Sequence, residues 1–227
     1  MLLCIPDVLT PEEVAQCRKA MSEAEWQDGR ATAGPQAAAV KKNYQLPLES
    51  PVSKKLGELV LAAVSRSPLF MSAALPLRIL PPMFNHYGEG QTFGVHVDGA
   101  IRTSVFTGER LRTDLSATLF LSEPEEYDGG DLSIETLYGA NEVKLPAGHL
   151  VLYPSTSLHC VTPVTRGMRV ASIFWVQSMI RDEGQRTILF DLDRTVQELQ
   201  AERGADDEAT VRLAGVYHNL IRQWAET

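Results

Sequence analysis

Three side chains that can bind a metal ion occur in two separate segments of the chain. His96 and Asp98 lie two residues apart at the end of an alternating segment, residues 93–98. Because alternate side chains of a strand point to the same side, one imidazole and one carboxylate converge there. His159 opens another predicted strand, which a jelly roll can place opposite the first. Two histidines and one carboxylate are the ligand set that selects non-haem Fe(II) and leaves coordination positions open for a bidentate co-substrate and dioxygen.

A candidate anion-binding residue, Arg169, follows ten residues after His159. Its segment alternates, so Arg169, Ala171 and Ile173 share one face. If this face points inward, the guanidinium is buried and needs an anion, and its planar fork matches a carboxylate. A dicarboxylate that reaches from the metal to Arg169 satisfies both ends, and 2-oxoglutarate has that shape. Tyr87 is placed to donate its hydroxyl to the same carboxylate.

The metal-site prediction depends on the whole pattern, because each part is weak alone. A pair such as His96-Val97-Asp98 arises by chance in many chains, and a lone histidine is usually structural. Arg169 alone is also open to a second interpretation, a structural ion pair with Asp131 or Asp114. The ordered set of pair, distal histidine and arginine favours a metal site beside a bound dicarboxylate. Three other histidines are not part of any recognisable ligand or catalytic motif and are interpreted as structural: His86, His149 and His218.

The elements that must position these residues are strands, because residues 77–177 have a two-residue hydrophobic period. The predicted strands are Leu77–Tyr87, Ser116–Leu121, Leu132–Tyr138, Glu142–Leu145, His149–Tyr153, His159–Val164 and Arg169–Gln177. Turns that contain glycine separate several of them, at 128–130, 146–148 and 165–167. Many short strands with regular turns predict a mainly β fold, a sandwich or jelly roll, with flanking helices.

Two helices are predicted before the β region. The first begins with a capping box at Thr10, Pro11 and Glu13, and its buried stripe is Val14, Cys17 and Met21. The second begins at Ser50-Pro51, and its stripe is Val52, Leu56, Leu59, Val60 and Ala63. Residues 29–40 between them are rich in glycine and alanine and are predicted to form a loop.

The end of the chain is predicted to form two more helices. The first has Leu192, Val196 and Leu199 on one face. The second is capped by Asp206 or Asp207, and its apolar residues are Val211, Tyr217, Leu220, Ile221 and Trp224. These are interpreted as packing faces, although the last helix also suits a homodimer contact. We therefore predict a β domain with N-terminal helices, residues 1–180, and a helical extension, residues 181–227.

The composition is that of a globular protein, since 44% of the 227 residues are hydrophobic and 22% are charged. A formal net charge of −8 argues against nucleic acid as a partner. The apolar start before Pro6 is too short for a secretion signal or a membrane span. The three cysteines have no C-x-x-C spacing, which argues against a disulfide framework or a zinc thiolate site and favours a reducing, cytoplasmic location.

Taken together, these motifs resemble the Fe(II)- and 2-oxoglutarate-dependent dioxygenases, and more closely the prolyl-hydroxylase-like branch that includes the bacterial PKHD-type hydroxylases. The resemblance spans nearly the whole chain. It is carried by Tyr87, Phe93–Arg102, Tyr127–Leu132, Tyr153–Ser155 before His159, and Arg166–Arg169. The tail helices also resemble the C-terminal extension of that family.

The resemblance implies a double-stranded β-helix in which the metal ligands are His96, Asp98 and His159. It also implies that Arg169 binds the C5 carboxylate of 2-oxoglutarate, with help from Tyr87. The expected enzyme uses Fe(2+), 2-oxoglutarate and O2, with L-ascorbate as a supporting reductant. It decarboxylates 2-oxoglutarate to succinate and CO2 while it hydroxylates an unactivated C–H bond. The expected substrate is amino-acid-like, peptidyl or another small molecule.

A second class of function stays open at this point, a non-enzymatic β-sandwich that binds or senses a metal or siderophore in iron uptake. A cupin with manganese or zinc is less favoured, because such sites commonly use more histidines. The charged loop 99–114, with Arg102, Arg110 and Arg112, is interpreted first as solvated and second as a lid that meets an anionic or polar substrate. Trp175 is interpreted as a core residue.

Overall fold

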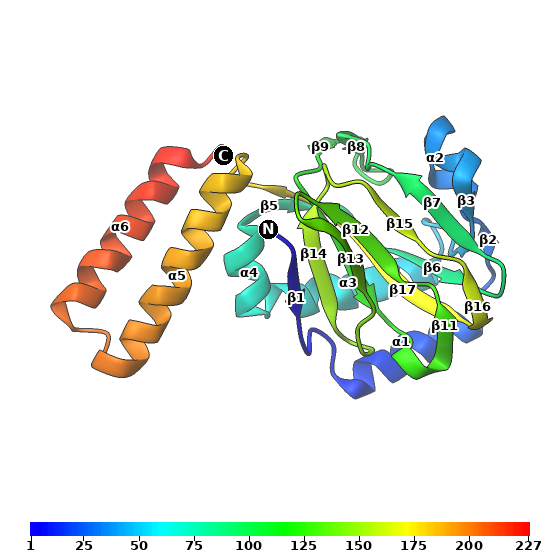
Figure 1. The fold of residues 1–227 in the computed structure, drawn as a ribbon, viewed down its shortest axis with the longest axis horizontal. Coiled ribbons are helices and arrows are strands. Elements are labelled where there is room, and N and C mark those ends of the chain that lie inside the picture. Colours follow the sequence, from blue (N-terminus) through cyan, green and yellow to red (C-terminus); the bar gives the residue numbers. More distant parts are fainter.

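Two antiparallel sheets face each other in the computed structural model, which describes all 227 residues (Figure 1). The larger sheet contains β1 (Leu3–Ile5), β2 (Gln27–Asp28), β4 (Tyr44–Gln45), β5 (Pro76–Ile79), β6 (Met83–Tyr87), β10 (Leu115–Phe120), β14 (Leu150–Pro154) and β17 (Arg169–Ser178). The smaller sheet contains β3 (Lys41–Lys42), β7 (Thr92–His96), β12 (Leu132–Thr136), β13 (Gly139–Val143) and β15 (His159–Val161). Two separate pairs are β8 (Ile101–Thr103) with β9 (Arg110–Arg112), and β11 (Tyr127–Gly129) with β16 (Val164–Gly167).

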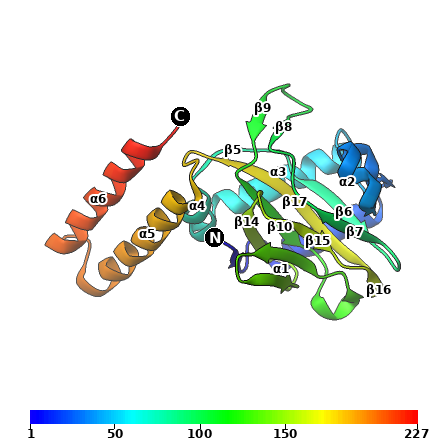
Figure 2. The same ribbon diagram turned by 45° about the horizontal axis from the view of Figure 1, so that its top comes forward.

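The strand order confirms the predicted double-stranded β-helix. The larger sheet runs β1-β14-β10-β17-β6-β4-β2, with β5 beside β17, and the smaller sheet runs β13-β12-β15-β7-β3. Neighbouring strands in these orders are mostly distant in sequence, so each sheet is assembled from crossovers between the two layers. The β8–β9 hairpin projects from the end of the sandwich (Figure 2).

Three of the helices cover the outer face of the larger sheet, one short helix packs on β7, and two helices follow the last strand (Figure 1). They are α1 (Pro11–Ser22), α2 (Pro35–Val40), α3 (Pro51–Ser65), α4 (Pro68–Ala74), α5 (Glu183–Arg203) and α6 (Glu208–Trp224), with short 3₁₀ turns η1 (Gly29–Thr32) and η2 (Pro124–Glu126). The predicted capping box of α1 is present, and its stripe of Val14, Cys17 and Met21 is buried. These helical stripes and the outer face of the larger sheet form one apolar core.

Strand alternation divides the larger sheet into an apolar outer face and an inner face that carries both polar and apolar side chains. In β10, Ala117 and Leu119 join the core beneath the helices, whereas Ser116 and Thr118 face the space between the sheets. In β17, Phe174 and Val176 pack toward the helices, and Arg169 lines the interior. The helices therefore bury the apolar outer face, while the inner face places Phe120, Val151 and Tyr153 in a second apolar cluster between the sheets, beside the polar cavity residues.

The C-terminal helices α5 and α6 form an antiparallel hairpin that stands beside the sandwich and contacts it through α4 (Figure 1). A small core of Leu75, Ile180 and Leu189 joins the two parts, and Tyr217, Leu220 and Trp224 pack against it. Tyr217, Leu220 and Trp224 therefore form contacts within the chain. Asp207, rather than Asp206, caps α6 by accepting a hydrogen bond from the Thr210 backbone N–H at 3.0 Å. Val211 is exposed, contrary to the predicted stripe.

Several local predictions are wrong at proline and glycine positions. The predicted strand Leu77–Tyr87 is two strands, because Pro81 and Pro82 lack the backbone N–H that a ladder needs. Residues 29–40 hold η1 and α2 instead of a loop, and α4 was not predicted. Gly167 ends a strand, β16, rather than forming only a turn; its φ is +73°, and a Cβ there would lie 2.0 Å from the Glu126 carbonyl oxygen. No helix in the chain combines the length and the apolar character needed to cross a membrane.

Candidate metal centre and co-substrate pocket

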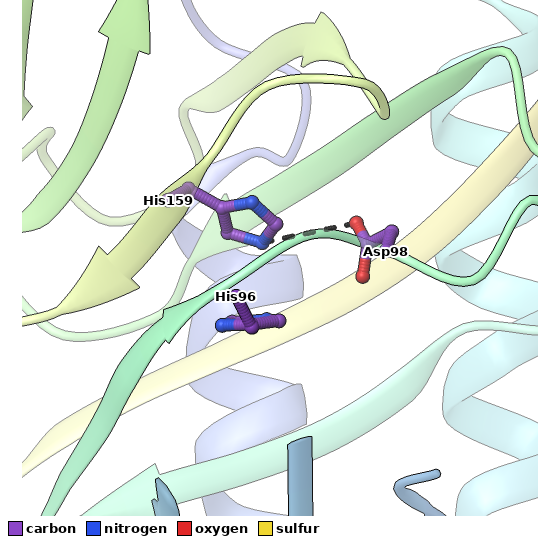
Figure 3. Close-up of side chains that lie close together, drawn as sticks. All are labelled: His96, Asp98 and His159. Carbon is purple, nitrogen blue, oxygen red and sulfur yellow. Dashed lines mark ion pairs between the residues drawn. The ribbon is translucent and has the colours of Figure 1, made fainter. Parts of the chain in front are cut away.

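The predicted metal-binding side chains come together inside the sandwich (Figure 3). His96 ends β7 and His159 begins β15, and the two residues are direct partners in the antiparallel pairing of these strands. Asp98 lies just beyond β7, so its carboxylate turns to the same side as the His96 ring. One possible ligand atom from each of the three residues lies within 4.8 Å of the others. The arrangement leaves one side open, as a facial triad requires.

Each histidine has one ring nitrogen held by the backbone. Nδ1 of His96 is 2.8 Å from the Gly94 carbonyl oxygen, and Nδ1 of His159 is 3.0 Å from the Ser157 carbonyl oxygen. Since a carbonyl oxygen only accepts hydrogen bonds, both Nδ1 atoms carry a proton and both Nε2 lone pairs are free for a metal. Burial, with a smaller contribution from His159, lowers the pKa of His96 to about 4, so this ring is neutral at neutral pH.

The aspartate is fixed by a hydroxyl from the opposite sheet. The Ser116 hydroxyl on β10 donates to Oδ2 of Asp98 at 2.6 Å, and it also contacts the Ser155 hydroxyl at 2.8 Å. The same Asp98 oxygen is 3.8 Å from Nε2 of His159. The Phe93 ring stacks on His96 with ring centroids 3.7 Å apart. These contacts limit the rotation of the ligands before a metal is bound.

A cavity of about 960 Å³ runs from the triad into the sandwich, where it reaches Arg169. Arg169 is 1% exposed, and it forms no ion pair with any carboxylate of the chain. The alternative pairings with Asp114 or Asp131 are wrong, because Asp114 pairs with Arg112 at 2.7 Å and Asp131 contacts Thr162. The guanidinium instead lies among aromatic rings, 5.4 Å from the centre of Tyr87 and 5.2 Å from that of Phe120.

This pocket suits the distal carboxylate of a dicarboxylic acid. Nε of Arg169 is buried without a hydrogen-bond partner. Tyr87 is the cross-strand partner of Arg169, and burial raises the pKa of Tyr87 to about 12, so its hydroxyl stays a donor. An unpaired buried guanidinium is costly, and an anion that fills the pocket removes that cost. The residues present therefore fit 2-oxoglutarate with one end at the triad and the other at Arg169.

Several cavity residues were missed or misread in the sequence. Ser116 and Thr118 were placed on a strand without a role, although polar residues that alternate within a buried strand are a usable signal. Trp175 is buried but lines the cavity, and the Arg102 guanidinium stacks on it at 3.8 Å. The solvated-loop interpretation holds for Arg110 alone, because Arg102 is half-buried and Arg112 pairs with Asp114 and Glu226.

Comparisons with known proteins agree with this site. Residues 82–177 match the 2OG-Fe(II) oxygenase superfamily, and residues 183–226 match the PKHD-type hydroxylase C-terminal domain. A PKHD-type hydroxylase of Methylobacillus flagellatus is 62% identical over 227 residues, which is all of both chains. A PKHD-type hydroxylase of Burkholderia cenocepacia is 58% identical over 226 residues, again covering 100% of both.

Solved structures share the fold at low sequence identity. A Pseudomonas putida prolyl-4-hydroxylase aligns with a TM-score of 0.51 and 21% identity over 78% of this chain and 92% of that one. A Trichoplax adhaerens prolyl hydroxylase, solved with a hypoxia inducible factor peptide fragment, aligns with a TM-score of 0.56 and 16% identity over 82% and 86%. The full-length relatives establish the family, and the activity carries Fe(2+), 2-oxoglutarate and O2 with it. The chain belongs to the PKHD-type hydroxylases, which are 2-oxoglutarate-dependent dioxygenases.

Proposed function

We propose that His96, Asp98 and His159 hold the ferrous ion of this hydroxylase through two Nε2 atoms and one carboxylate oxygen. Arg169 binds the C5 carboxylate of 2-oxoglutarate, and the Tyr87 hydroxyl donates a second hydrogen bond to it. The observation that carries this assignment is the geometry: three ligand atoms within 4.8 Å of one another, and an unpaired guanidinium in the same cavity.

Iron, 2-oxoglutarate and dioxygen supply the oxidising chemistry, in which one oxygen atom enters succinate and the other hydroxylates a C–H bond of the substrate. The protein orients these reactants. Ser116 keeps the Asp98 carboxylate turned toward the two imidazoles. Arg169 fixes the far end of the co-substrate, so that its 2-oxo acid end meets the triad. Phe93 and Tyr153 enclose the histidines and limit the access of water.

The substrate side of the cavity accepts an amino-acid-like, peptidyl or small-molecule substrate. A hydroxylated peptide is consistent with the peptide seen on the Trichoplax neighbour, and L-ascorbate serves as the supporting reductant.

Residues 1–180 form the catalytic part, and residues 181–227 form a helical extension. All three cysteines are free thiols, which is typical of proteins in the reducing cytoplasm, the location that we propose. Exposed apolar residues on the helical hairpin, such as Ile188 and Val216, suit a homodimer that sedimentation can detect.

The test is 2-oxoglutarate turnover by the iron-loaded protein with ascorbate. We expect wild-type protein to release succinate and CO2 and to consume O2, slowly even without the true substrate. His159→Ala removes one ligand, so Fe(II) binding and succinate formation should both fall at least about a hundredfold. His149→Ala is the matched control, because His149 lies outside the cavity and its ring faces Asp7, with Nε2 3.5 Å from Oδ1. Full turnover by His159→Ala at limiting iron contradicts the assignment.

A further inference from the structure

Two cations in the catalytic cavity have no role in holding iron or 2-oxoglutarate. Lys41 lies on β3, and Arg102 lies on β8. Both line the same cavity as the triad, and neither forms an ion pair with any carboxylate of the chain. Such half-buried or buried charges are normally paired, so their isolation indicates that a ligand supplies the missing charge.

Arg102 is held in place by its flat face rather than by an acid. Its Cζ atom lies 3.8 Å from the centre of the Trp175 ring, which is cation–π contact distance. One Nη2–H also makes a long hydrogen bond of 3.5 Å to the Thr32 carbonyl oxygen. Stacking uses the face of the guanidinium and leaves most of its N–H donors free at the edge. That edge matches a carboxylate of a molecule in the cavity.

Lys41 is 4% exposed, yet its ammonium group is without an acidic partner. Nζ lies 5.2 Å from the centre of the Phe93 ring, the same ring that stacks on His96. The end of the lysine stem also packs close to Gly29, where a Cβ atom would lie only 3.2 Å from Lys41 Cε. Asp28 is the nearby surface acid, and Arg30 already binds both of its oxygens. The ammonium is therefore positioned without being neutralised.

A charge balance of the cavity shows what is missing. Asp98 is the only carboxylate among its lining residues, against the three cations Lys41, Arg102 and Arg169. The two charges of Fe(II) and the one of Arg169 are balanced by Asp98 and the two carboxylates of 2-oxoglutarate. Lys41 and Arg102 are left over, with two positive charges. Their mutual repulsion also contributes to lowering the pKa of Lys41, after burial, to about 8.

We propose that Lys41 and Arg102 together bind a carboxylate of the substrate, so that this hydroxylase selects anionic substrates. The inference rests on the proposed function, because it assigns the remaining part of the same cavity. It narrows the substrate to a molecule that carries a free carboxylate in addition to the C–H bond that reacts. The carboxylate belongs to a free acid or to an acidic residue or C-terminus of a peptide.

The experiment measures binding under nitrogen to protein saturated with Fe(II) and 2-oxoglutarate, by calorimetric titration. Without oxygen no turnover occurs, and saturating 2-oxoglutarate keeps the probes away from Arg169. The probes are matched acids and amides: phenylacetate with phenylacetamide, N-acetylalanine with its amide, and acetyl-Ala-Glu-Ala-amide with acetyl-Ala-Gln-Ala-amide. We expect at least one acid to bind about tenfold more tightly than its amide, as a charge-assisted pair predicts. The member that binds best distinguishes a free acid from a peptide side chain.

The variants are Lys41→Met and Arg102→Gln, which remove one charge each at similar side-chain size. Each should abolish the preference of the protein for the acid over the amide. Lys41→Arg keeps the charge and should preserve it. Lys42→Met and Arg110→Gln are matched controls, because both residues are exposed neighbours on the same strand or hairpin. Thermal unfolding checks that every variant is folded, and Lys41→Gln or Arg102→Met replaces a neutral variant that is not.

Two results overturn the inference: no acid binds better than its amide, or the preference survives in both neutral variants. Neither result affects the proposed function, which is tested separately by the release of succinate from 2-oxoglutarate in the wild-type protein. Loss of that turnover in the wild type, with anion binding intact, would overturn the proposed function and leave a carboxylate-binding cavity.

Discussion

His96 and His159 lie directly opposite each other on antiparallel strands, with their ring centroids 4.2 Å apart. The ladder between β7 and β15 therefore sets the spacing of the two imidazoles, and only the aspartate needs a side-chain support of its own. The backbone thus positions the two histidines, and the Ser116 hydroxyl positions Asp98.

Ser116→Ala should weaken iron binding although Ser116 is not a ligand. The substitution removes the 2.6 Å hydrogen bond to Asp98 and frees the carboxylate to rotate away from the imidazoles. Loss of such an outer hydrogen bond typically costs 10–100-fold in metal affinity or activity, and we expect about that effect on the Fe(II) dissociation constant. Ser172→Ala is the control, because the Ser172 hydroxyl is also buried but lies outside the cavity and has no partner. Equal iron affinities of the two variants would remove the assigned role.

Arg169→Met should stabilise the protein in the absence of 2-oxoglutarate and abolish its response to it. The guanidinium is buried without a counter-charge, and a well-packed apolar replacement often stabilises a protein by roughly 1–4 kcal/mol. Without added metal, binding of 2-oxoglutarate raises the unfolding temperature through the contact of its carboxylate with Arg169. Thermal unfolding with and without 2-oxoglutarate measures both effects. The control is Arg166→Met, since Arg166 is exposed and pairs with Asp128 at 2.7 Å. An unchanged 2-oxoglutarate response of Arg169→Met would be decisive against its role.

Stability should rise with pH between about 8 and about 10.5 because of Lys41. Burial is the main cause that lowers its pKa to about 8, and Arg102 lowers it further while Asp28 and Asp98 oppose the shift. In this window the unfolded chain holds the lysine proton and the folded chain has lost it, so the free energy of unfolding increases with pH. The full effect is on the order of 3 kcal/mol.

Urea unfolding of wild type and Lys41→Met across this window measures the effect as a difference, so that other titrating groups cancel. The wild type should gain stability relative to the variant as the pH rises. A constant difference between the two proteins would show that the Lys41 pKa is not lowered. The preference for acids over amides should fall above pH 8 for the same reason.

Leu189→Ala should loosen the helical hairpin and leave the metal site intact. Leu189 is fully buried against Leu75 and Ile180, and such truncations cost about 2–5 kcal/mol. Hydrogen exchange should accelerate in α5 and α6 while β7, β10 and β17 stay protected. Leu192→Ala is the control, because Leu192 lies on the same helix without full burial. Equal acceleration in the sandwich would show one cooperative unit rather than the two parts at residues 1–180 and 181–227.

The two-residue period of strands predicted where most of the candidate site lies. It placed His96 with Asp98, and Arg169 on one face with Ala171 and Ile173, because both depend only on alternation along one strand. Which face of that strand points inward was left open, and the closed sandwich decides it. Lys41 gave no such signal, since β3 has two residues and exists only through its pairing with β7. The contact of Arg102 with Trp175 joins segments that are far apart in the sequence, and no local pattern encodes it. Pairings of this kind are decided by the closed sandwich as a whole.

Strand β17 is one uninterrupted element that carries Arg169 at its start and Trp175 six residues later. At about 3.3 Å for each residue, the two side chains are anchored roughly 20 Å apart. Because a sheet strand in the middle of its ladder stretches very little, the two proposed anion sites, one at Arg169 and one beside Trp175, keep a fixed separation. The co-substrate and the substrate are thereby held at a fixed offset. A substrate must match both the charge of its site and the distance from that site to the metal, so that its C–H bond reaches the oxidant.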